Sequence, residues 1–335
     1  MADPPPVLSD PLTHGGLHGM DALSEVLRVI RLTGGVFLEA SFTAPWSVTA
    51  HIGPEDCRPT MAQPARIVAF HYVLDGRMRL EVRGSAPFEV RAGAIVLLPH
   101  NDPHTLASGP GLPAVDADHL VQLAREGALA RIDYGGGGAA TNIVCGFVGS
   151  EARRHPLLDA LPRVLNLDLN GRTGADWIAA SFRFAAKEVA AARPGSSAVL
   201  AKLSELMFVE AVREYVHGMP AERQGWLAGL RDPAVGRALA LLHARPAHPW
   251  TAEALAAEAL LSRSAFADRF TGLVGVPPMS YLTAWRMHVA AQSLRESGRS
   301  IAQIAAAVGY ESEATFARAF KREMGVAPGR YRSEA

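Results

Sequence analysis

Cysteine is scarce in this sequence, because only Cys57 and Cys145 occur among its 335 residues. Two cysteines cannot build a framework of several disulfide bonds, and their scarcity fits a reducing compartment. Long apolar runs are lacking too, since none reaches the roughly 18 residues that a membrane-spanning helix needs. The first residues show no charged-then-apolar export signal. We therefore expect a cytoplasmic protein.

Charge of one sign is not in excess either. The formal net charge is zero, and a content of 49% hydrophobic and 20% charged residues is ordinary for a globular chain. The charge is unevenly placed, because residues 232–335 hold 12 basic and 9 acidic side chains whereas residues 1–231 hold 21 and 24. A mildly basic C-terminal part is compatible with binding to phosphate groups but does not identify nucleic acid by itself.

The texture of the sequence changes three times along the chain. Residues 1–19 are rich in Pro, Gly and His and are expected to form a disordered tail. Residues 20–150 begin with a short helical pattern and continue as short β-rich runs separated by turns such as Asp75-Gly76, which predict a small barrel or sandwich. Residues 151–230 turn helical and are expected to form a helical extension and linker. Residues 231–335 are helical throughout.

The helical extension contains a candidate dimer contact. Its clearest helices are expected at residues 176–192 and 196–217. The second helix carries a stripe of apolar residues, namely Val199, Leu203, Leu206, Met207, Val212 and Val216. Such a stripe belongs either to the core of one chain or to the seam of a dimer, and the pattern leaves both interpretations open.

The most informative feature is an internal duplication near the C-terminus. Ser262, Phe266, Phe270, Gly275, Val276, Pro278 and Tyr281 recur fifty positions later as Ser312, Phe316, Phe320, Gly325, Val326, Pro328 and Tyr331. Each copy has the order turn, capped helix and closing loop, which is the second half of a helix-turn-helix. A small helical bundle without DNA-binding function would also show Phe pairs and Ser caps, but not two copies with matching caps, turns and exits.

The second copy shows the signals of a helix-turn-helix most completely. Ser300 and Gln303 form a capping box at the start of its first helix. Gly309 is placed to take the left-handed conformation in the turn, and Ser312 caps the next helix. In the first copy, Thr251–Ala259 precedes the turn Leu260-Leu261. The residues expected on the outward, DNA-facing sides of the two recognition helices are Arg263, Ser264, Ala267 and Asp268 in the first copy and Ser312, Glu313, Ala314, Ala317, Arg318, Lys321 and Arg322 in the second.

The helix between the copies is expected at residues 278–297, which makes it about 30 Å long. Major grooves on one face of DNA repeat about every 34 Å. The two recognition helices are therefore spaced to enter successive major grooves.

These residues resemble a known family. The segment IAQIAAAVGYESEATFARAFKREMGVAPGRYR resembles the second helix-turn-helix of AraC/XylS-type transcriptional regulators, and residues 251–278 resemble the first. The resemblance implies that Arg318 contacts bases or phosphate, with Glu313, Ala314 and Ala317 beside it in the groove. Lys321 and Arg322 would hold the DNA backbone, which positions the protein without reading sequence.

The first copy departs from the family pattern at two positions. Leu260 stands where the turn usually carries glycine, so the turn must reach its geometry without that residue. Asp268 stands at the outward position that Arg318 occupies in the second copy. A carboxylate there is repelled by phosphate, and its productive use is to accept a hydrogen bond from cytosine N4. We therefore expect the first helix to read its half-site differently and the second to supply more electrostatic affinity.

The N-terminal half resembles a cupin barrel of the kind found in this regulator family. Residues 66–104, with the stretches GAIVLLPHNDPHTL, TNIVCGFV and HPLLDALPRVLNL, carry the resemblance. Enzymatic cupins bind metal through a His-x-His pair, a Glu and a later His. Here His71 and His104 stand at comparable places, but Val73 stands where the second His would be. No metal cofactor is therefore expected, although Cys145 together with the two histidines would make a plausible soft-metal set.

Strand alternation places Ile67, Ala69, His71 and Val73 on one face, which lines the barrel. His71 is therefore expected in the interior, either as a hydrogen-bonded core residue or as part of an effector site with His104 and Trp46.

Together these features predict an α+β protein, with an N-terminal cupin-like β-barrel plus helices and a C-terminal all-α tandem helix-turn-helix domain. The preferred hypothesis is a transcriptional regulator, not an enzyme, whose barrel senses a small molecule. Its expected partners are double-stranded promoter DNA, an unidentified small-molecule effector, a second copy of the chain in a homodimer and, if it activates transcription, RNA polymerase. The alternative is a metal-dependent cupin enzyme fused to a DNA-binding domain.

Overall fold

The computed structural model of the protein describes residues 22–29, 32–58, 61, 64–122, 130–151, 156–170, 177–178, 180–184, 195–220 and 225–333. The expected N-terminal tail, residues 1–19, lies outside them. The chain divides into two compact units. One, called the β unit here, is Ile30–Arg231 with Gly272–Gly275, and the other, the helical unit, is Met1–Val29, Asp232–Thr271 and Val276–Ala335.

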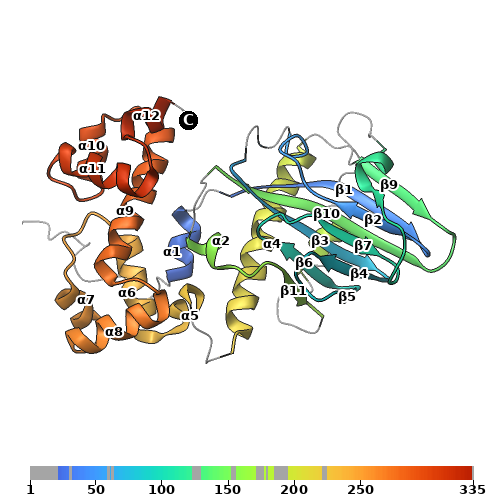
Figure 1. Ribbon diagram of the computed structural model, residues 1–335, viewed down its shortest axis with the longest axis horizontal. Coiled ribbons are helices and arrows are strands. Elements are labelled where there is room, and N and C mark those ends of the chain that lie inside the picture. Colours follow the sequence, from blue (N-terminus) through green and yellow to red (C-terminus); the bar gives the residue numbers. More distant parts are fainter. Residues whose placement is uncertain are drawn as a thin grey trace, which may run out of the picture. The chain divides into compact units, whose positions relative to one another are not determined.

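Two mainly antiparallel sheets form the β unit (Figure 1). The six-stranded sheet has the order β11-β6-β3-β10-β1-β9 and the five-stranded sheet the order β5-β4-β7-β2-β8. Their strands are β1 (Thr33–Thr43), β2 (Ser47–Ala50), β3 (Arg66–Asp75), β4 (Arg77–Val82), β5 (Phe88–Arg91), β6 (Ala94–Leu98), β7 (His104–Ala107), β8 (Val115–Asp116), β9 (Ala130–Gly135), β10 (Ala140–Ser150) and β11 (Leu165–Asp168). The short strand β11 lies within the part of the sequence expected to be helical, and it pairs with β6.

The core of the β unit lies between the two sheets. Alternation along β4 buries Met78, Leu80 and Val82 while the residues between them stay more exposed. On β3, Ala69 and Val73 join the same core, as the alternation predicted. The expected turn at Asp75-Gly76 is present, with Gly76 left-handed (φ 79°), but the hairpin it suggested is wrong, because β3 and β4 lie in different sheets and do not pair with each other.

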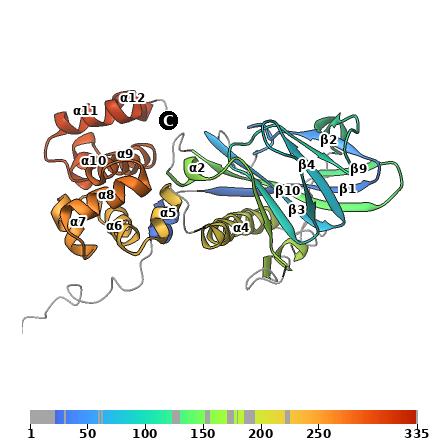
Figure 2. The same ribbon diagram turned by 60° about the horizontal axis from the view of Figure 1, so that its bottom comes forward.

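Helices cover the other face of the six-stranded sheet. Helical elements of this unit with defined bounds are η1 (Ala117–Leu120), α2 (Pro156–Ala160), α4 (Ser196–Gly218) and α5 (Trp226–Arg231). Helix α4 lies against β1 and β10 (Figure 2). It approaches β1 closely because a Cβ on Gly34 would lie 2.6 Å from Ser204 Cβ and 2.8 Å from Ala201 O. Of the expected helix 176–192, residues 177, 178 and 180–184 are described and are helical, and Phe182 stacks on Tyr72 with ring centroids 4.2 Å apart.

The apolar residues of α4 do not form one stripe, which corrects the interpretation of that pattern. Met207, Val212 and Val216 are buried. Val199 is 40% exposed and Leu206 is 50% exposed, with Leu203 half-buried between them. The two sets lie on different sides of the helix, because only one side can pack against the sheet.

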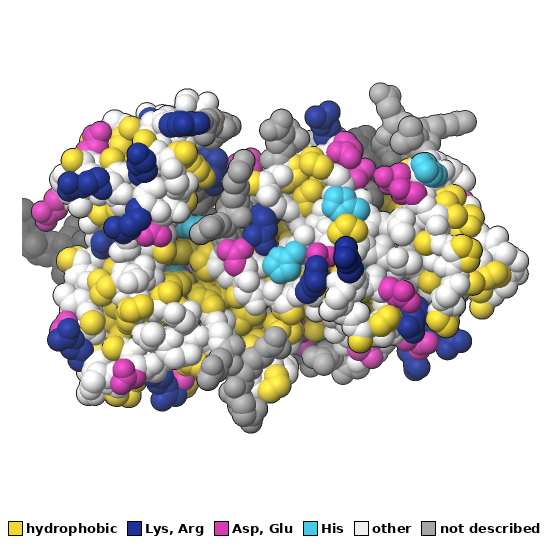
Figure 3. Space-filling view, in the orientation of Figure 1, with side chains coloured by type: hydrophobic (Ala, Val, Ile, Leu, Met, Phe, Trp, Pro, Cys, Tyr) yellow, Lys and Arg dark blue, Asp and Glu magenta, His cyan; other side chains and the backbone are white. Residues whose placement is uncertain are grey.

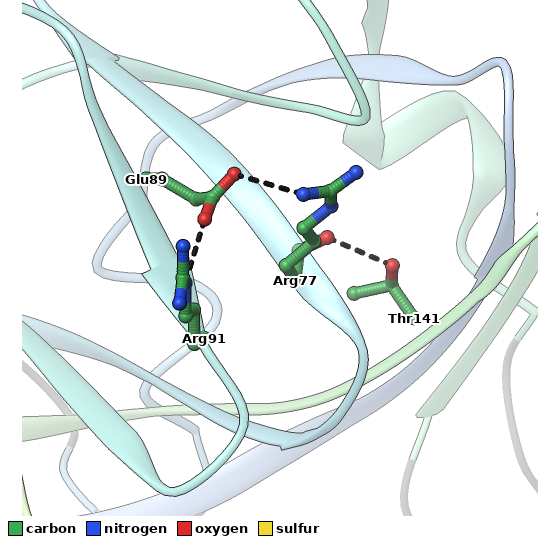
Figure 4. A network of polar contacts seen from close by, with 4 residues as sticks. All are labelled: Arg77, Glu89, Arg91 and Thr141. Carbon is green, nitrogen blue, oxygen red and sulfur yellow. Dashed lines mark hydrogen bonds and ion pairs between the residues drawn. The ribbon is translucent and has the colours of Figure 1, made fainter.

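The outer face of the five-stranded sheet carries ion pairs at the edge formed by β4 and β5. Glu89 accepts hydrogen bonds from Arg91 Nε (2.7 Å) and Arg77 Nη1 (3.4 Å), as Figure 4 shows. Thr141 Oγ1 donates to the Arg77 carbonyl oxygen (2.9 Å), which ties β10 to the start of β4. The exposed ion pairs contribute little to stability, but they keep this edge of the sheet charged.

In its described residues the helical unit contains helices alone: α1 (Ala22–Val29), α6 (Pro233–Ala244), α7 (Ala252–Glu258), α8 (Arg263–Val274), α9 (Pro278–Glu296), α10 (Ile301–Ala307), α11 (Glu313–Met324) and α12 (Pro328–Ser333). Asp232 caps α6, because its carboxylate accepts from the N–H groups of Ala234 and Val235, and Pro233 is the first helical residue, as predicted. Among the described helices of the whole chain, none combines the length and the hydropathy needed to cross a bilayer.

The sequence duplication is a structural duplication. Phe266 and Phe270 are fully buried with ring centroids 5.6 Å apart, and Phe316 and Phe320 repeat both the burial and the 5.6 Å distance. The equivalent tyrosines close each core, since Tyr281 lies 5.9 Å from Phe270 and Tyr331 lies 5.4 Å from Phe320.

Helix α1 packs on α6 of the helical unit, although the sequence pattern grouped it with the β-rich part. Val26 is fully buried. Beneath the helix lies His243, which is 1% exposed, makes a 2.7 Å hydrogen bond between its Nε2 and Tyr281 OH, and lies 4.3 Å from the Trp285 ring. Burial lowers the pKa of His243 to about 3, although the main chain of Ala22 opposes the shift.

This buried histidine predicts a pH-dependent stability. An unfolded histidine has a pKa near 6.5, so between pH 6.5 and about 3 the unfolded chain binds a proton that the folded chain does not. The contribution to stability is full above pH 6.5 and falls by about 1.4 kcal/mol for each pH unit below it. We expect His243→Gln to reduce the drop in thermal midpoint between pH 7.5 and 5.5, measured by calorimetry. His248→Gln, at an exposed position, is the control and should keep the wild-type drop; equal drops in all three proteins would contradict the assignment.

Candidate nucleic-acid interface and buried core of the β unit

The first recognition helix, α8, presents its polar side to solvent. It begins at Arg263 after Ser262, whose Oγ accepts a hydrogen bond from the Ala265 N–H (3.3 Å). Its outward side carries the four residues that were predicted to contact DNA. Arg263, Ser264 and Asp268 are exposed, and Ala267 is half-buried.

The second recognition helix, α11, repeats this arrangement with better-defined caps. Ser312 Oγ accepts from the Thr315 N–H (3.4 Å), and Ser300 and Gln303 form the predicted capping box at the start of α10. Ala317 is half-buried, and its small side chain adds little width to the middle of the helix. The remaining predicted contact residues are all exposed: Ser312, Glu313, Ala314, Arg318, Lys321 and Arg322.

The turns of the two motifs differ in length and strain. Gly309 takes the left-handed conformation (φ 83°), and two residues separate it from the cap Ser312. In the first motif the left-handed residue is Leu260 (φ 56°), and one residue separates it from Ser262. The expectation that this turn is made without glycine is confirmed, and the leucine side chain there is 89% exposed.

The basic side chains of the two recognition helices differ in their partners, although each helix has a net charge of +1. On α8, Arg263 pairs with Glu253 (2.9 Å) and Arg269 binds Asp232 Oδ2 with two nitrogens (2.6 and 2.8 Å), while Asp268 adds a negative charge. On α11, Arg322 pairs with Glu323 (3.2 Å), whereas Arg318 donates to the uncharged Thr315 Oγ1 (3.4 Å). Lys and Arg side chains are spread over the visible face of the helical unit (Figure 3). The sequence did not single out Arg269, because its partner lies 37 positions away.

The core of the β unit contains a buried chain of polar groups. His71 Nδ1 lies 3.0 Å from Cys145 Sγ, and His71 Nε2 lies 2.7 Å from His104 Nε2. His104 Nδ1 lies 2.9 Å from the Asp102 carbonyl oxygen. The histidines are each 3% exposed and the cysteine is 4% exposed. The predicted interior position of His71 is therefore confirmed.

The protons of this hydrogen-bonded series can be placed by starting from its last acceptor, the Asp102 carbonyl oxygen. A carbonyl oxygen accepts hydrogen bonds and does not donate, so His104 donates through Nδ1 and accepts at Nε2. His71 must then donate through Nε2 and accept at Nδ1 from the Cys145 thiol. Burial lowers the pKa of both histidines and raises the pKa of Cys145 to about 12, so all three groups are uncharged near neutral pH.

Geometry at these residues is that of a hydrogen-bonded chain rather than a metal site. Two nitrogens bound to one tetrahedral zinc ion would be about 3.3 Å apart, whereas the two Nε2 atoms are 2.7 Å apart. Cys145 lies at the other ring nitrogen of His71, away from His104. Among the described residues, no group of three or more His, Cys, Asp and Glu side chains is placed to hold a metal ion.

Trp46 belongs to the same apolar core but lies away from the two histidines along the sheet. The pairing of β2 with β7 sets Ala50 opposite His104 and Ser47 opposite Ala107, so Trp46 lies at the other end of this ladder. Its ring stacks on Phe42 with centroids 4.1 Å apart, and it is 2% exposed. Its Nε1 is buried and has no hydrogen-bond partner among the described residues.

Comparisons with known proteins match both halves of the chain. Residues 21–217 match the cupin model Cupin_6, and residues 255–334 match the helix-turn-helix domain model HTH_18. An AraC-like transcription regulator of Streptomyces lividans is 35% identical over 93% of this chain and 98% of its own length. The HTH-type transcriptional regulator AlkR of Acinetobacter baylyi is 30% identical over 94% and 100%, respectively. Among solved structures, the DNA-binding domain of AdpA in complex with a target DNA is 30% identical, with 31% of this chain and 92% of that chain covered and a TM-score of 0.30.

The matches to family models and relatives extend over nearly the whole sequence and agree with the two units of the structure. The chain belongs to the AraC-type transcriptional regulators that carry an N-terminal cupin domain and a C-terminal helix-turn-helix domain.

Proposed function

We propose that this regulator binds promoter DNA in the cytoplasm through both recognition helices, α8 and α11, and that it acts by this binding and not as an enzyme. The observation that carries the proposal is the repeat of a capped, outward-facing helix on either side of α9. With 19 residues, α9 is about 28 Å long, which approaches the repeat of about 34 Å between major grooves on one DNA face.

The residues of the two helices would divide the work. Arg318 would reach base edges or phosphate, with Glu313, Ala314 and Ala317 beside it, because the small side chains let the helix approach the groove. Lys321 and Arg322 would hold the DNA backbone and set the register. On α8 the exposed Asp268 would accept from a cytosine N4 in the other half-site, with Arg263 and Ser264 next to it. The association is then salt-dependent, because basic side chains release counterions from DNA.

Substitutions at the two equivalent positions test this division. Arg318→Ala is expected to weaken binding to the selected duplex by about 1–3 kcal/mol if Arg318 makes a bidentate contact to a base. Asp268→Ala should change the base preference of the other half-site. Selection from random duplexes followed by gel shift at two salt concentrations measures both effects. Unchanged base preference in Asp268→Ala would refute the role of that residue, and wild-type binding that ignores sequence or salt would refute the proposal as a whole.

For the β unit, we propose that the apolar core binds the effector near Trp46. A buried donor without a partner is unfavourable by about 1–3 kcal/mol, and an acceptor atom of a bound molecule would remove this penalty. The residues around it are mostly aliphatic and aromatic. His71 and His104 already satisfy each other, so they would contact the effector through their rings. The effector would therefore be a small, mainly apolar molecule with one hydrogen-bond acceptor.

A thermal-shift series tests the effector site. Aliphatic and aromatic ketones or carboxylic acids are expected to raise the melting temperature, whereas hydrocarbons of the same skeleton should not. Trp46→Phe should retain the stacking on Phe42 and lose the difference between the two series. Trp226→Phe, which changes a buried tryptophan on α5, is the matched control and should keep it. Equal shifts for both series in the wild type would contradict the role of the indole N–H.

We further propose that the outer side of α4 pairs with the same helix of a second copy. Val199 and Leu206, both exposed, and the half-buried Leu203 between them form an apolar row at helical spacing. An antiparallel pairing centred on Leu206 would set Lys202 opposite Glu210 of the second copy, because both lie four residues from the centre. The complementary charges favour a homodimer over other occupants of this face.

Sedimentation of charge variants tests this pairing. Leu206→Glu is expected to convert a dimer into a monomer, because it places two carboxylates at the centre of the contact. Lys202→Glu should weaken the dimer, and adding Glu210→Lys should restore it. Leu260→Glu makes the same change at an exposed leucine of the helical unit and should leave the dimer intact. A wild-type protein that sediments as a monomer at micromolar concentration would refute the proposal.

A further inference from the structure

Arg286 lies near the middle of α9, at the point where the helix passes from one motif to the other. The first half of α9 contributes Tyr281 and Trp285 to the core around His243 and Phe270. The second half contributes Met287, Ala290, Ala291 and Leu294 to the core of the second motif. The helix therefore fixes the distance between the motifs. By itself, however, it leaves each motif able to rotate about the half of α9 on which it packs.

On one side, the Arg286 guanidinium binds the loop that precedes the first motif. Its Nε donates to the Pro246 carbonyl oxygen (2.6 Å) and its Nη2 to the His248 carbonyl oxygen (2.9 Å). This loop is itself closed, because the His248 N–H and the Trp250 indole N–H both donate to the Arg245 carbonyl oxygen (3.1 and 3.2 Å). It leads directly into Thr251, the N-cap of α7.

On the other side, the same guanidinium lies against the turn of the second motif. Its Cζ is 5.8 Å from the centroid of the Tyr310 ring, which packs edge-on against Phe316 of α11 (5.7 Å). Such a cation–π contact is stronger where the charge is partly desolvated, and Arg286 is half-buried.

The two motifs also meet directly at this point. A Cβ on Gly309 would lie 2.6 Å from the Ala247 carbonyl oxygen and 2.9 Å from Arg286 Nη2. The turn of the second motif therefore touches the loop of the first without an intervening side chain, and the guanidinium lies beside the contact.

We propose that Arg286 is the positioning residue that fixes the rotation of the two motifs about α9, and thereby the half-site spacing that the protein reads. The guanidinium holds both motifs at once, with two carbonyl groups of one and the aromatic turn of the other. A rigid connection raises affinity sharply when the spacing of two sites matches it and lowers affinity when the spacing does not, whereas a flexible connection tolerates many spacings. The inference rests on the proposed binding of DNA by both motifs.

A spacing series on DNA tests the proposal with the full-length protein. The duplex selected by the wild type is remade with one base pair deleted or inserted between the half-sites, which turns one half-site by about 35° relative to the other. We expect the wild type to lose affinity about tenfold or more at either altered spacing. For Arg286→Met we expect the loss to shrink to about threefold or less, mainly because affinity falls at the original spacing. Arg286→Lys, which keeps the charge, should be intermediate.

Arg295→Met is the matched control on the same helix. Arg295 also lies over a tyrosine ring, 5.6 Å from the Tyr331 centroid, and binds the hydroxyl of the same residue, but Tyr331 belongs to the second motif. Its loss should leave the spacing profile sharp. Affinity of each variant for duplexes with a single half-site separates positioning from general damage, and it should stay within about twofold of the wild type.

Three outcomes would overturn the inference. One is a spacing profile of Arg286→Met and Arg286→Lys as sharp as that of the wild type. Another is an equal loss of affinity at all spacings and at single half-sites, because a domain that is only destabilised would lose affinity for every duplex alike. The third is a control profile as broad as that of Arg286→Met. Failure of the underlying DNA-binding proposal looks different, because the wild type itself would then protect one half-site and show no dependence on spacing.

Discussion

The burial of one pair of phenylalanines in each motif is the constraint on which the helical unit depends. Phe266 and Phe270, like Phe316 and Phe320, are fully buried, and each such side chain contributes roughly 1.5–3 kcal/mol relative to an exposed one. Because residues four apart share a face, burying each pair fixes the rotation of its helix about its own axis. The polar sides of α8 and α11 then face solvent as a consequence of packing, which makes them available for the DNA contacts proposed above.

The β unit satisfies a different constraint, because its core must hold polar groups as well as apolar ones. The chain from Cys145 through His71 and His104 to the Asp102 carbonyl oxygen leaves no hydrogen-bonding ring nitrogen of the two histidines without a neighbour. Satisfied in this way, and with their pKa values lowered by burial, the histidines remain neutral. In the binding mode proposed above, the polar contact to an effector would come from Trp46, whose buried Nε1 has no hydrogen-bond partner among the described residues. The polar groups that satisfy one another and the donor proposed to bind a ligand are thus different groups of one core.

Local signals in the sequence were enough to predict the two motifs. The caps at Asp232, Ser300 and Ser312 and the left-handed Gly309 depend on residues within three or four positions of one another. Contacts between distant segments were not predicted, because no pattern of spacing encodes them. Examples are the packing of α1 on α6, the pairing of β11 with β6 and the binding of Arg286 to the Pro246 carbonyl oxygen, 40 positions away. The stripe on α4 was misread for a related reason, since periodicity shows which residues share a side but not which side the sheet will cover.

The two turns differ in how freely evolution or an engineer can exchange their central residue. A left-handed backbone is unfavourable by about 1–2 kcal/mol for a residue with a Cβ, and Leu260 adopts it with its side chain 89% exposed. Glycine at position 260 would relieve this strain and remove almost no packing. Gly309 has no such latitude, because even a methyl group would collide with the Ala247 carbonyl oxygen. A thermostable version of this regulator could therefore be sought at the first turn, while the second must remain as it is.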